Sequence, residues 1–170
     1  MAGHSQWELE LGTDVGVRPL SQGSAEGILY GGCLSILVAS LGTPYEIQTE
    51  GTILFIEDVA TKPYQVDRML MQLKLAGKLV DVRGIIFGEM VDCVQKEQAH
   101  SLNKVVIRVV GELRVPVAYG VRSGHVSSGN ITLPIGIRAA MKVTSEGLTL
   151  KILESATAPR SSRAESVKTL

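Results

Sequence analysis

The sequence has few aromatic residues, few cysteines and no surplus of charge of either sign. Aromatic residues make up 4% of its 170 positions, and its two cysteines are Cys33 and Cys93. Two cysteines cannot form the disulfide framework of a small secreted domain, so we expect two small buried thiols without a redox or metal role. The 17 basic residues balance 17 acidic ones, which argues against a nucleic-acid binder that relies on bulk positive charge.

Long hydrophobic runs are also absent. No apolar stretch approaches the roughly 20 residues of a membrane span, and the first residues have neither the basic nor the apolar part of a signal peptide. We therefore expect a soluble, cytoplasmic chain that binds neither nucleic acid nor a membrane. The sequence does contain 45% hydrophobic residues and 18 glycines, which exclude global disorder and predict an aliphatic core with many turns.

Strand and helix patterns alternate from about Gly27 onward. β-Branched apolar runs predict buried, parallel-type strands, whereas apolar residues three and four positions apart predict amphipathic helices. The predicted strands are 28–30, 52–56, 82–89 and 117–119. The predicted helices are 33–41, 63–77 and 102–113. Alternation over 137–143 and 148–152, around a turn at 145–147, predicts a β-hairpin with one solvated face, so the fold class is mixed α/β.

Both ends of the chain show a weaker pattern. Trp7, Leu9 and Leu11 alternate with polar or small residues, which predicts one short edge strand in a segment that otherwise indicates loop. The last residues lack periodicity and predict a disordered tail. The expected organisation is an N-terminal extension or linker remnant (1–24), one domain (25–154) and the tail (155–170).

Two segments carry side chains capable of catalysis. Glu57 and Asp58 come directly after the buried strand 52–56, and ligands gather at the carboxyl ends of strands in open α/β sheets. The alternative is that these acids are solvated in a loop or cap the following helix.

The second segment is the glycine-rich stretch 120–130, which contains His125. Such a loop suits a site where backbone and imidazole approach a ligand, and the alternative is a surface histidine. We assign no role to His4 or His100.

Several familiar motifs do not occur. The histidines and cysteines match no zinc spacing, and the sequence contains no phosphate-binding P-loop, no dinucleotide fingerprint and no nucleophile elbow. A carboxylate and a histidine form two thirds of a hydrolytic triad, so they need a third member.

Many dispersed segments, in order, resemble the C-terminal domain of the LD-carboxypeptidases. These serine peptidases include the muramoyltetrapeptide carboxypeptidases and the microcin C self-immunity proteins, and the resemblance covers roughly residues 25–154. The segments that carry it are Gly31–Ser35, Leu41–Tyr45, Ile53–Val59, Lys62–Leu70, Gly84–Glu89, Pro116–Gly120, Gly124–His125 and Leu133–Gly136.

The resemblance implies a swivelling β/β/α domain with a mixed sheet and flanking helices. It also implies a Ser–His–Glu triad shared between two domains, in which Glu57 and His125 match the glutamate and histidine. The implied reaction is hydrolysis of an amide between an L- and a D-centre in a murein tetrapeptide-like substrate, as in peptidoglycan recycling. The resemblance also implies that the reaction needs neither metal nor cofactor, and that the domain can form a homodimer.

The family's nucleophilic serine and oxyanion donors belong to an N-terminal domain, for which residues 1–26 are far too short. Ser123, Ser127 and Ser128 lie near His125 in sequence, but none occupies a strained strand-to-helix turn, so we expect no nucleophile in this chain. Residues 59–61 also depart from the family's usual pattern. The chain is thus expected to be half of a serine peptidase, with a serine-bearing domain as partner. The alternatives are a non-catalytic peptide-binding domain and a structural remnant that needs a partner chain.

Overall fold

Four neighbouring parallel strands contain the apolar runs that the sequence pattern predicts as strands. The computed structural model describes residues 7–94 and 99–156, and in it β3, β4, β5 and β6 pair side by side in parallel register. β4 and β5 are buried at every residue, as expected for strands covered on both faces. The strand bounds are β3 Gly23–Cys33, β4 Thr52–Glu57, β5 Gly84–Gly88 and β6 Val117–Val121.

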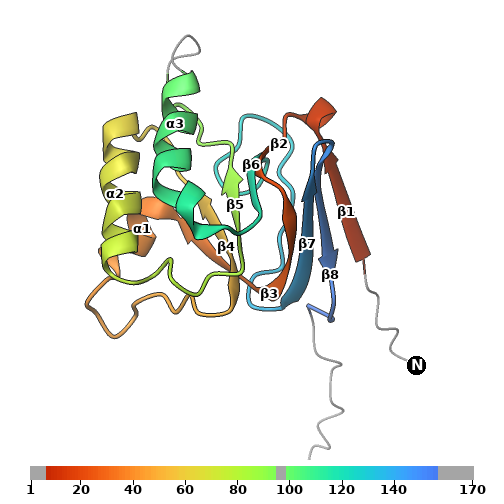
Figure 1. The fold of residues 1–170 in the computed structure, drawn as a ribbon, viewed down its shortest axis with the longest axis horizontal. Helices are drawn as coiled ribbons and strands as arrows, with labels where there is room; N and C mark the ends of the chain where they lie inside the picture. The colour runs from red at the N-terminus through yellow and green to blue at the C-terminus, as the bar shows by residue number, and fades with distance from the viewer. Residues whose placement is uncertain (1–6, 95–98, 157–170) are drawn as a thin grey trace, which may run out of the picture.

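One helix follows each of the first three parallel strands, and the helices lie together on one face of the sheet (Figure 1). They are α1 Leu34–Ala39, α2 Pro63–Leu75 and α3 Ala99–Val110, which continues into a 3-10 turn at Gly111–Leu113. Pro63 begins α2, where its missing N–H costs nothing. The three predicted helices are therefore confirmed. In the described part of the chain, no helix has the length and hydrophobicity needed to cross a membrane.

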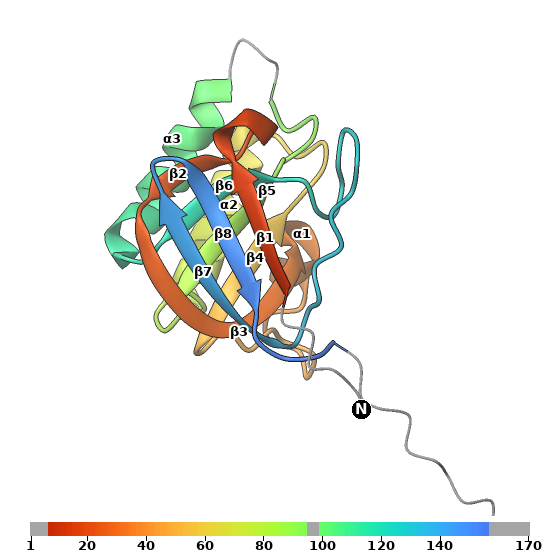
Figure 2. The ribbon, with the colours of Figure 1, turned by 90° about the vertical axis from the view of Figure 1, so that its right-hand side faces the viewer.

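β3 connects the parallel strands to an antiparallel layer. Its residues 28–33 pair with β4 in parallel, whereas its residues 23–28 pair with β7 antiparallel. Figure 2 shows β3 curving between the two layers, with β7, β8 and β1 beside one another. β7 and β8 are the predicted hairpin. The bounds are β7 Arg138–Thr144, β8 Gly147–Ile152 and β1 Trp7–Gly12.

Two hydrophobic cores lie on opposite faces of the parallel strands. Along β4, Leu54 and Ile56 face the helices, while Ile53 and Phe55 face the antiparallel layer, because successive strand residues point to opposite faces. The molecule thus consists of a helix layer, a parallel layer and an antiparallel layer (Figure 1). This is the α/β fold with a mixed sheet and flanking helices that the resemblance predicts.

The residues before Gly27 contribute both edge strands of the sheet. β1 confirms the predicted edge strand, and it pairs with β8 from Trp7 opposite Ile152 to Gly12 opposite Gly147. A 3-10 turn at Thr13–Val15 leads to β2 (Arg18–Ser21), which pairs with β6 at the other edge. The prediction of loop over β2 is wrong, because Pro19 is tolerated where a strand lies at a sheet edge.

One predicted domain limit lies within a strand, and the predicted tail lies mostly outside the residues that the structure describes. The limit between residues 24 and 25 lies inside β3, and the strands before and after it belong to the same sheet. The predicted tail at 155–170 lies, from residue 157 onward, outside the described residues.

Tyr119 on β6 makes the stability of the fold sensitive to alkaline pH. Its side chain is 4% exposed, and its ring stacks on Phe87 and lies under the Arg18 guanidinium. Burial raises the pKa of Tyr119 from 10.0 to about 12, although Arg18 opposes the shift. The unfolded chain therefore releases this proton first, so the stabilisation is complete below pH 10 and is lost as the pH rises toward 12.

We expect Tyr119→Phe to remove this part of the alkaline destabilisation, worth up to about 2.7 kcal/mol for a shift of about two pKa units. Urea unfolding of both proteins at neutral and alkaline pH measures it. Tyr30, Tyr45 and Tyr64 are exposed and are the same in both proteins, so the comparison isolates Tyr119. Parallel losses of stability in the wild type and the variant would contradict the role of Tyr119.

Candidate active site

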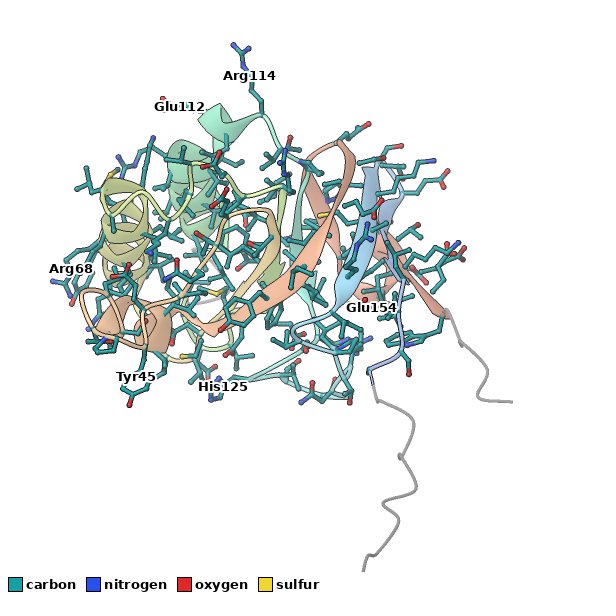
Figure 3. The ribbon with its side chains drawn as sticks, turned by 90° about the horizontal axis from the view of Figure 1, so that it is seen from below. Tyr45, Arg68, Glu112, Arg114, His125 and Glu154 are labelled. Carbon is teal, nitrogen blue, oxygen red and sulfur yellow. The ribbon has the colours of Figure 1, made fainter. Side chains whose placement is uncertain are left out.

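Side chains capable of chemistry gather where the parallel strands end. Glu57 is the last residue of β4, Glu89 follows β5, and His125 lies in the loop after β6. Parallel strands bring their carboxyl ends to the same edge of a sheet, which explains this convergence. Figure 3 shows His125 on the opposite side of the molecule from Arg114, which precedes β6.

Glu57 and His125, 68 residues apart in sequence, are hydrogen-bonded to each other. Oε2 of Glu57 lies 2.8 Å from Nδ1 of His125 and also accepts the backbone N–H of His125 at 2.9 Å. The Glu57 side chain is 5% exposed, whereas that of His125 is 52% exposed. A carboxylate can only accept, so the neutral ring carries its proton on Nδ1 and keeps Nε2 as an acceptor. The structure thus unites the two residues that the resemblance singles out.

Two glycines allow this close approach. A Cβ on Gly124, whose φ is +86°, would lie 2.6 Å from Cδ of Glu57, and a Cβ on Gly88 would lie 2.7 Å from Cβ of Glu57. Real Cβ atoms do not make contacts this short, so a side chain at Gly124 or at Gly88 would force Glu57 or its neighbours to move. The glycine-rich composition indicates Gly124, but no local pattern reveals the role of Gly88.

Asp58 has a structural role. It is 3% exposed, and its Oδ2 accepts the backbone N–H and the hydroxyl of Ser35 at 3.0 and 2.7 Å, in the first turn of α1. Its Oδ1 accepts the Val59 N–H and the Thr61 hydroxyl at 2.8 and 2.9 Å. The alternative that both acids are solvated or cap the following helix is wrong, because both are buried and Asp58 caps the preceding helix.

Both cysteines have a raised pKa. Burial raises the pKa of the partly exposed Cys33 thiol, and the nearby Asp58 and Glu57 carboxylates raise it further. Burial also raises the pKa of Cys93, whose Sγ lies 3.8 Å from the Asp58 carbonyl oxygen. A raised pKa keeps a thiol protonated and weakly nucleophilic. The prediction of a buried thiol is confirmed for Cys93, whereas Cys33 is only partly buried.

The serines near His125 make other contacts. The Ser127 backbone N–H donates to Oε2 of Glu89 at 2.8 Å, and its hydroxyl donates to the same carboxylate at 3.1 Å. Ser123 is 6% exposed, and its N–H donates to the Val121 carbonyl at 2.9 Å. Neither these two nor Ser128 hydrogen-bonds to the His125 ring within the described residues. Over residues 7–94 and 99–156, the His, Cys, Asp and Glu side chains form no group of three that could hold a metal ion.

The fold and this pair define an α/β domain that presents a histidine oriented by a buried carboxylate at the carboxyl edge of its parallel strands. The chain belongs to the LD-carboxypeptidase C-terminal domain family, whose model matches residues 26–141. This match confirms the family that the sequence resembles, and the structure confirms the predicted fold class.

Curated relatives and solved structures agree with this assignment. The chain is 45% identical to a probable murein peptide carboxypeptidase of Bacillus subtilis, over 74% of this chain and 40% of that protein. It is 33% identical to the murein tetrapeptide carboxypeptidase of Pseudomonas aeruginosa, over 69% and 38% of the two chains. The muramoyltetrapeptide carboxypeptidase of Oxalobacter formigenes superposes with a TM-score of 0.74 at 28% identity, over 88% of this chain and 50% of that one. The chain thus spans less than half the length of these curated relatives.

Proposed function

We propose that this chain supplies the glutamate and the histidine of a Ser–His–Glu triad that hydrolyses an L,D-amide bond in a murein-type peptide. The observation that carries the proposal is the 2.8 Å contact between Oε2 of Glu57 and Nδ1 of His125. The substrate class is supported by the relatives, which are named murein peptide and murein tetrapeptide carboxypeptidases.

The proposed roles follow from the chemistry of the pair. Nε2 of His125 takes the proton of the serine hydroxyl as its oxygen attacks the amide carbon, and His125 then gives this proton to the departing amine. Water then attacks the resulting acyl-serine ester: His125 takes a proton from the water and returns it to the serine oxygen as the ester bond breaks and the acid product leaves. Glu57 holds the ring in the required tautomer and stabilises the imidazolium that forms in each half of the reaction.

The serine and the oxyanion donors are proposed to come from an N-terminal domain like that of the relatives. Two facts support this assignment. The chain matches 40% of the Bacillus subtilis relative. Among the residues that the structure describes, Ser123, Ser127 and Ser128 make no hydrogen bond to the His125 ring. We also propose that the reaction needs no metal or cofactor, that it takes place in the cytoplasm, and that the domain self-associates.

Complementation tests this function. The purified chain alone is expected to release no D-amino acid from a murein tetrapeptide, whereas the chain mixed with the serine-bearing domain of the Bacillus subtilis relative is expected to release it. A partner domain whose serine is replaced by alanine provides the control. Loss of the nucleophile removes about 10⁶-fold of the rate in a well-studied serine protease.

Two results would contradict the proposal. The first is hydrolysis by the chain alone that Ser→Ala at position 123, 127 or 128 abolishes. The second is a chain that binds the peptide equally well with and without Glu57 and His125 and never supports hydrolysis, which would favour a non-catalytic peptide-binding domain.

A further inference from the structure

The histidine-bearing loop between β6 and β7 contains no helix or strand, so specific contacts must hold it in place. Packing holds the His125 ring incompletely, since its side chain is 52% exposed. Within the loop, the Asn130 side chain donates to the Gly124 carbonyl at 3.3 Å, and the Ile131 N–H donates to the Arg122 carbonyl at 2.7 Å. These bonds close the loop on itself, but they do not attach it to the parallel strands.

The far end of the loop is bonded to Leu29 of β3 through residues 136 and 137. Two carboxylates attach the part of the loop around His125 to the strands. Glu57 at the end of β4 binds residue 125, and Glu89 just after β5 binds residue 127 through the Ser127 N–H at 2.8 Å and its hydroxyl at 3.1 Å. Hydrogen bonds to a charged acceptor are stronger than those between neutral groups. His125 is therefore one of two anchored positions, and only Val126 separates it from the other, Ser127.

The backbone around Glu89 is itself fixed relative to Glu57. Val59 and Val91 form a parallel bridge beyond the ends of β4 and β5, and the Ala60 N–H donates to the Val91 carbonyl at 2.8 Å. Met90, directly after Glu89, is 2% exposed and has a φ of +54°. A non-glycine residue stays in this conformation only where its surroundings determine it, so the Glu89 backbone has little freedom to move.

We propose that Glu89 is a positioning residue for His125, acting through Ser127. This inference rests on the proposed function and adds a second carboxylate to the site. Glu57 selects the tautomer of the imidazole, whereas Glu89 fixes where the loop holds the ring relative to an incoming serine and amide. A displacement of about 1 Å at a catalytic group can cost about 10²-fold in rate, so the second anchor matters although it does not touch the ring.

The variants that test this role are Glu89→Ala, which removes both bonds to Ser127, and Glu89→Gln, which keeps an oxygen that accepts the Ser127 N–H. Ser127→Ala removes only the hydroxyl bond, and the neighbouring Ser128→Ala is the matched control. Because the contact is exposed, we expect all four variants to fold with melting temperatures close to that of the wild type.

Two measurements are made on each variant. Nitrogen-15 shifts of the His125 ring in the chain alone report how firmly Nδ1 stays protonated, and they do not depend on activity. Steady-state hydrolysis by the chain mixed with the serine-bearing domain gives kcat and KM. For Glu89→Ala we expect the ring shifts to move toward those of free histidine and kcat to fall about 10- to 100-fold at nearly constant KM. Glu89→Gln should recover most of both, and Ser128→Ala should match the wild type.

Unchanged ring shifts in a folded Glu89→Ala variant would overturn the positioning role, as would a wild-type kcat in that variant. A fall in melting temperature with unchanged ring shifts would overturn it too, because it would assign Glu89 to general stability. If the wild-type mixture is inactive, the proposed function fails, while the ring shifts still decide whether Glu89 positions His125.

Discussion

When the chain is mixed with the serine-bearing domain (the reconstituted enzyme), kcat for hydrolysis is expected to fall about 10⁴-fold for Glu57→Gln and about 10⁶-fold for His125→Ala. Glutamine has the size of glutamate, so it fits against Gly88 and Gly124, but it has no charge to stabilise the imidazolium. Its amide NH₂ also competes to face Nδ1, which would favour the wrong tautomer. Alanine at position 125 removes the base altogether.

Glu112→Gln is the matched control for this prediction. Glu112 is exposed and pairs with Lys74, and Figure 3 shows it on the opposite side of the molecule from His125. The control should keep wild-type kinetics, since it loses only a surface ion pair. Wild-type kcat in either Glu57→Gln or His125→Ala would rule out the triad assignment, provided that circular dichroism shows both variants folded.

The sequence predicts most of the fold because the parallel strands are unusually distinct. β4 and β5 are buried on both faces, so their sequences are continuous apolar runs, and the helices between them show regular apolar spacing. β2 is missed for the opposite reason. It lies at an edge, contains Pro19 and pairs with β6 about a hundred positions away, so nothing local marks it as a strand.

The candidate site is predictable only in part from the residues themselves. Position after a buried strand indicates both Glu57 and Asp58, and local sequence cannot tell them apart. The structure separates them, since Asp58 uses its oxygens on Ser35, Val59 and Thr61, whereas Glu57 faces His125. The family resemblance selects Glu57 because it carries a long-range pairing that spacing alone cannot show. The Glu89–Ser127 contact spans 38 positions and has no local pattern either.

Gly124→Ala is expected to lower kcat of the reconstituted enzyme by at least about 10²-fold, because it separates Glu57 from His125. The new Cβ would lie 2.6 Å from Cδ and Cγ and 2.8 Å from Oε2 of Glu57, so the carboxylate or the loop must move. Glu57 has little room for this movement, since Gly88 packs against its Cβ from another strand. The hydrogen bonds that Oε2 accepts from residue 125 would then lengthen or break.

Gly129→Ala separates this steric effect from backbone strain. Gly129 also has a left-handed backbone, with φ of +54° against +86° at Gly124, but nothing lies within 4 Å of its added Cβ. Alanine at either position takes a left-handed backbone, which costs about 1 kcal/mol or more, and only Gly124→Ala also collides with Glu57. We therefore expect Gly129→Ala to keep nearly wild-type kcat and the wild-type nitrogen-15 shifts of His125, whereas Gly124→Ala should lose both. Equal losses of kcat in the two variants would attribute the effect to loop strain and remove Gly124 from the support of the Glu57–His125 pair.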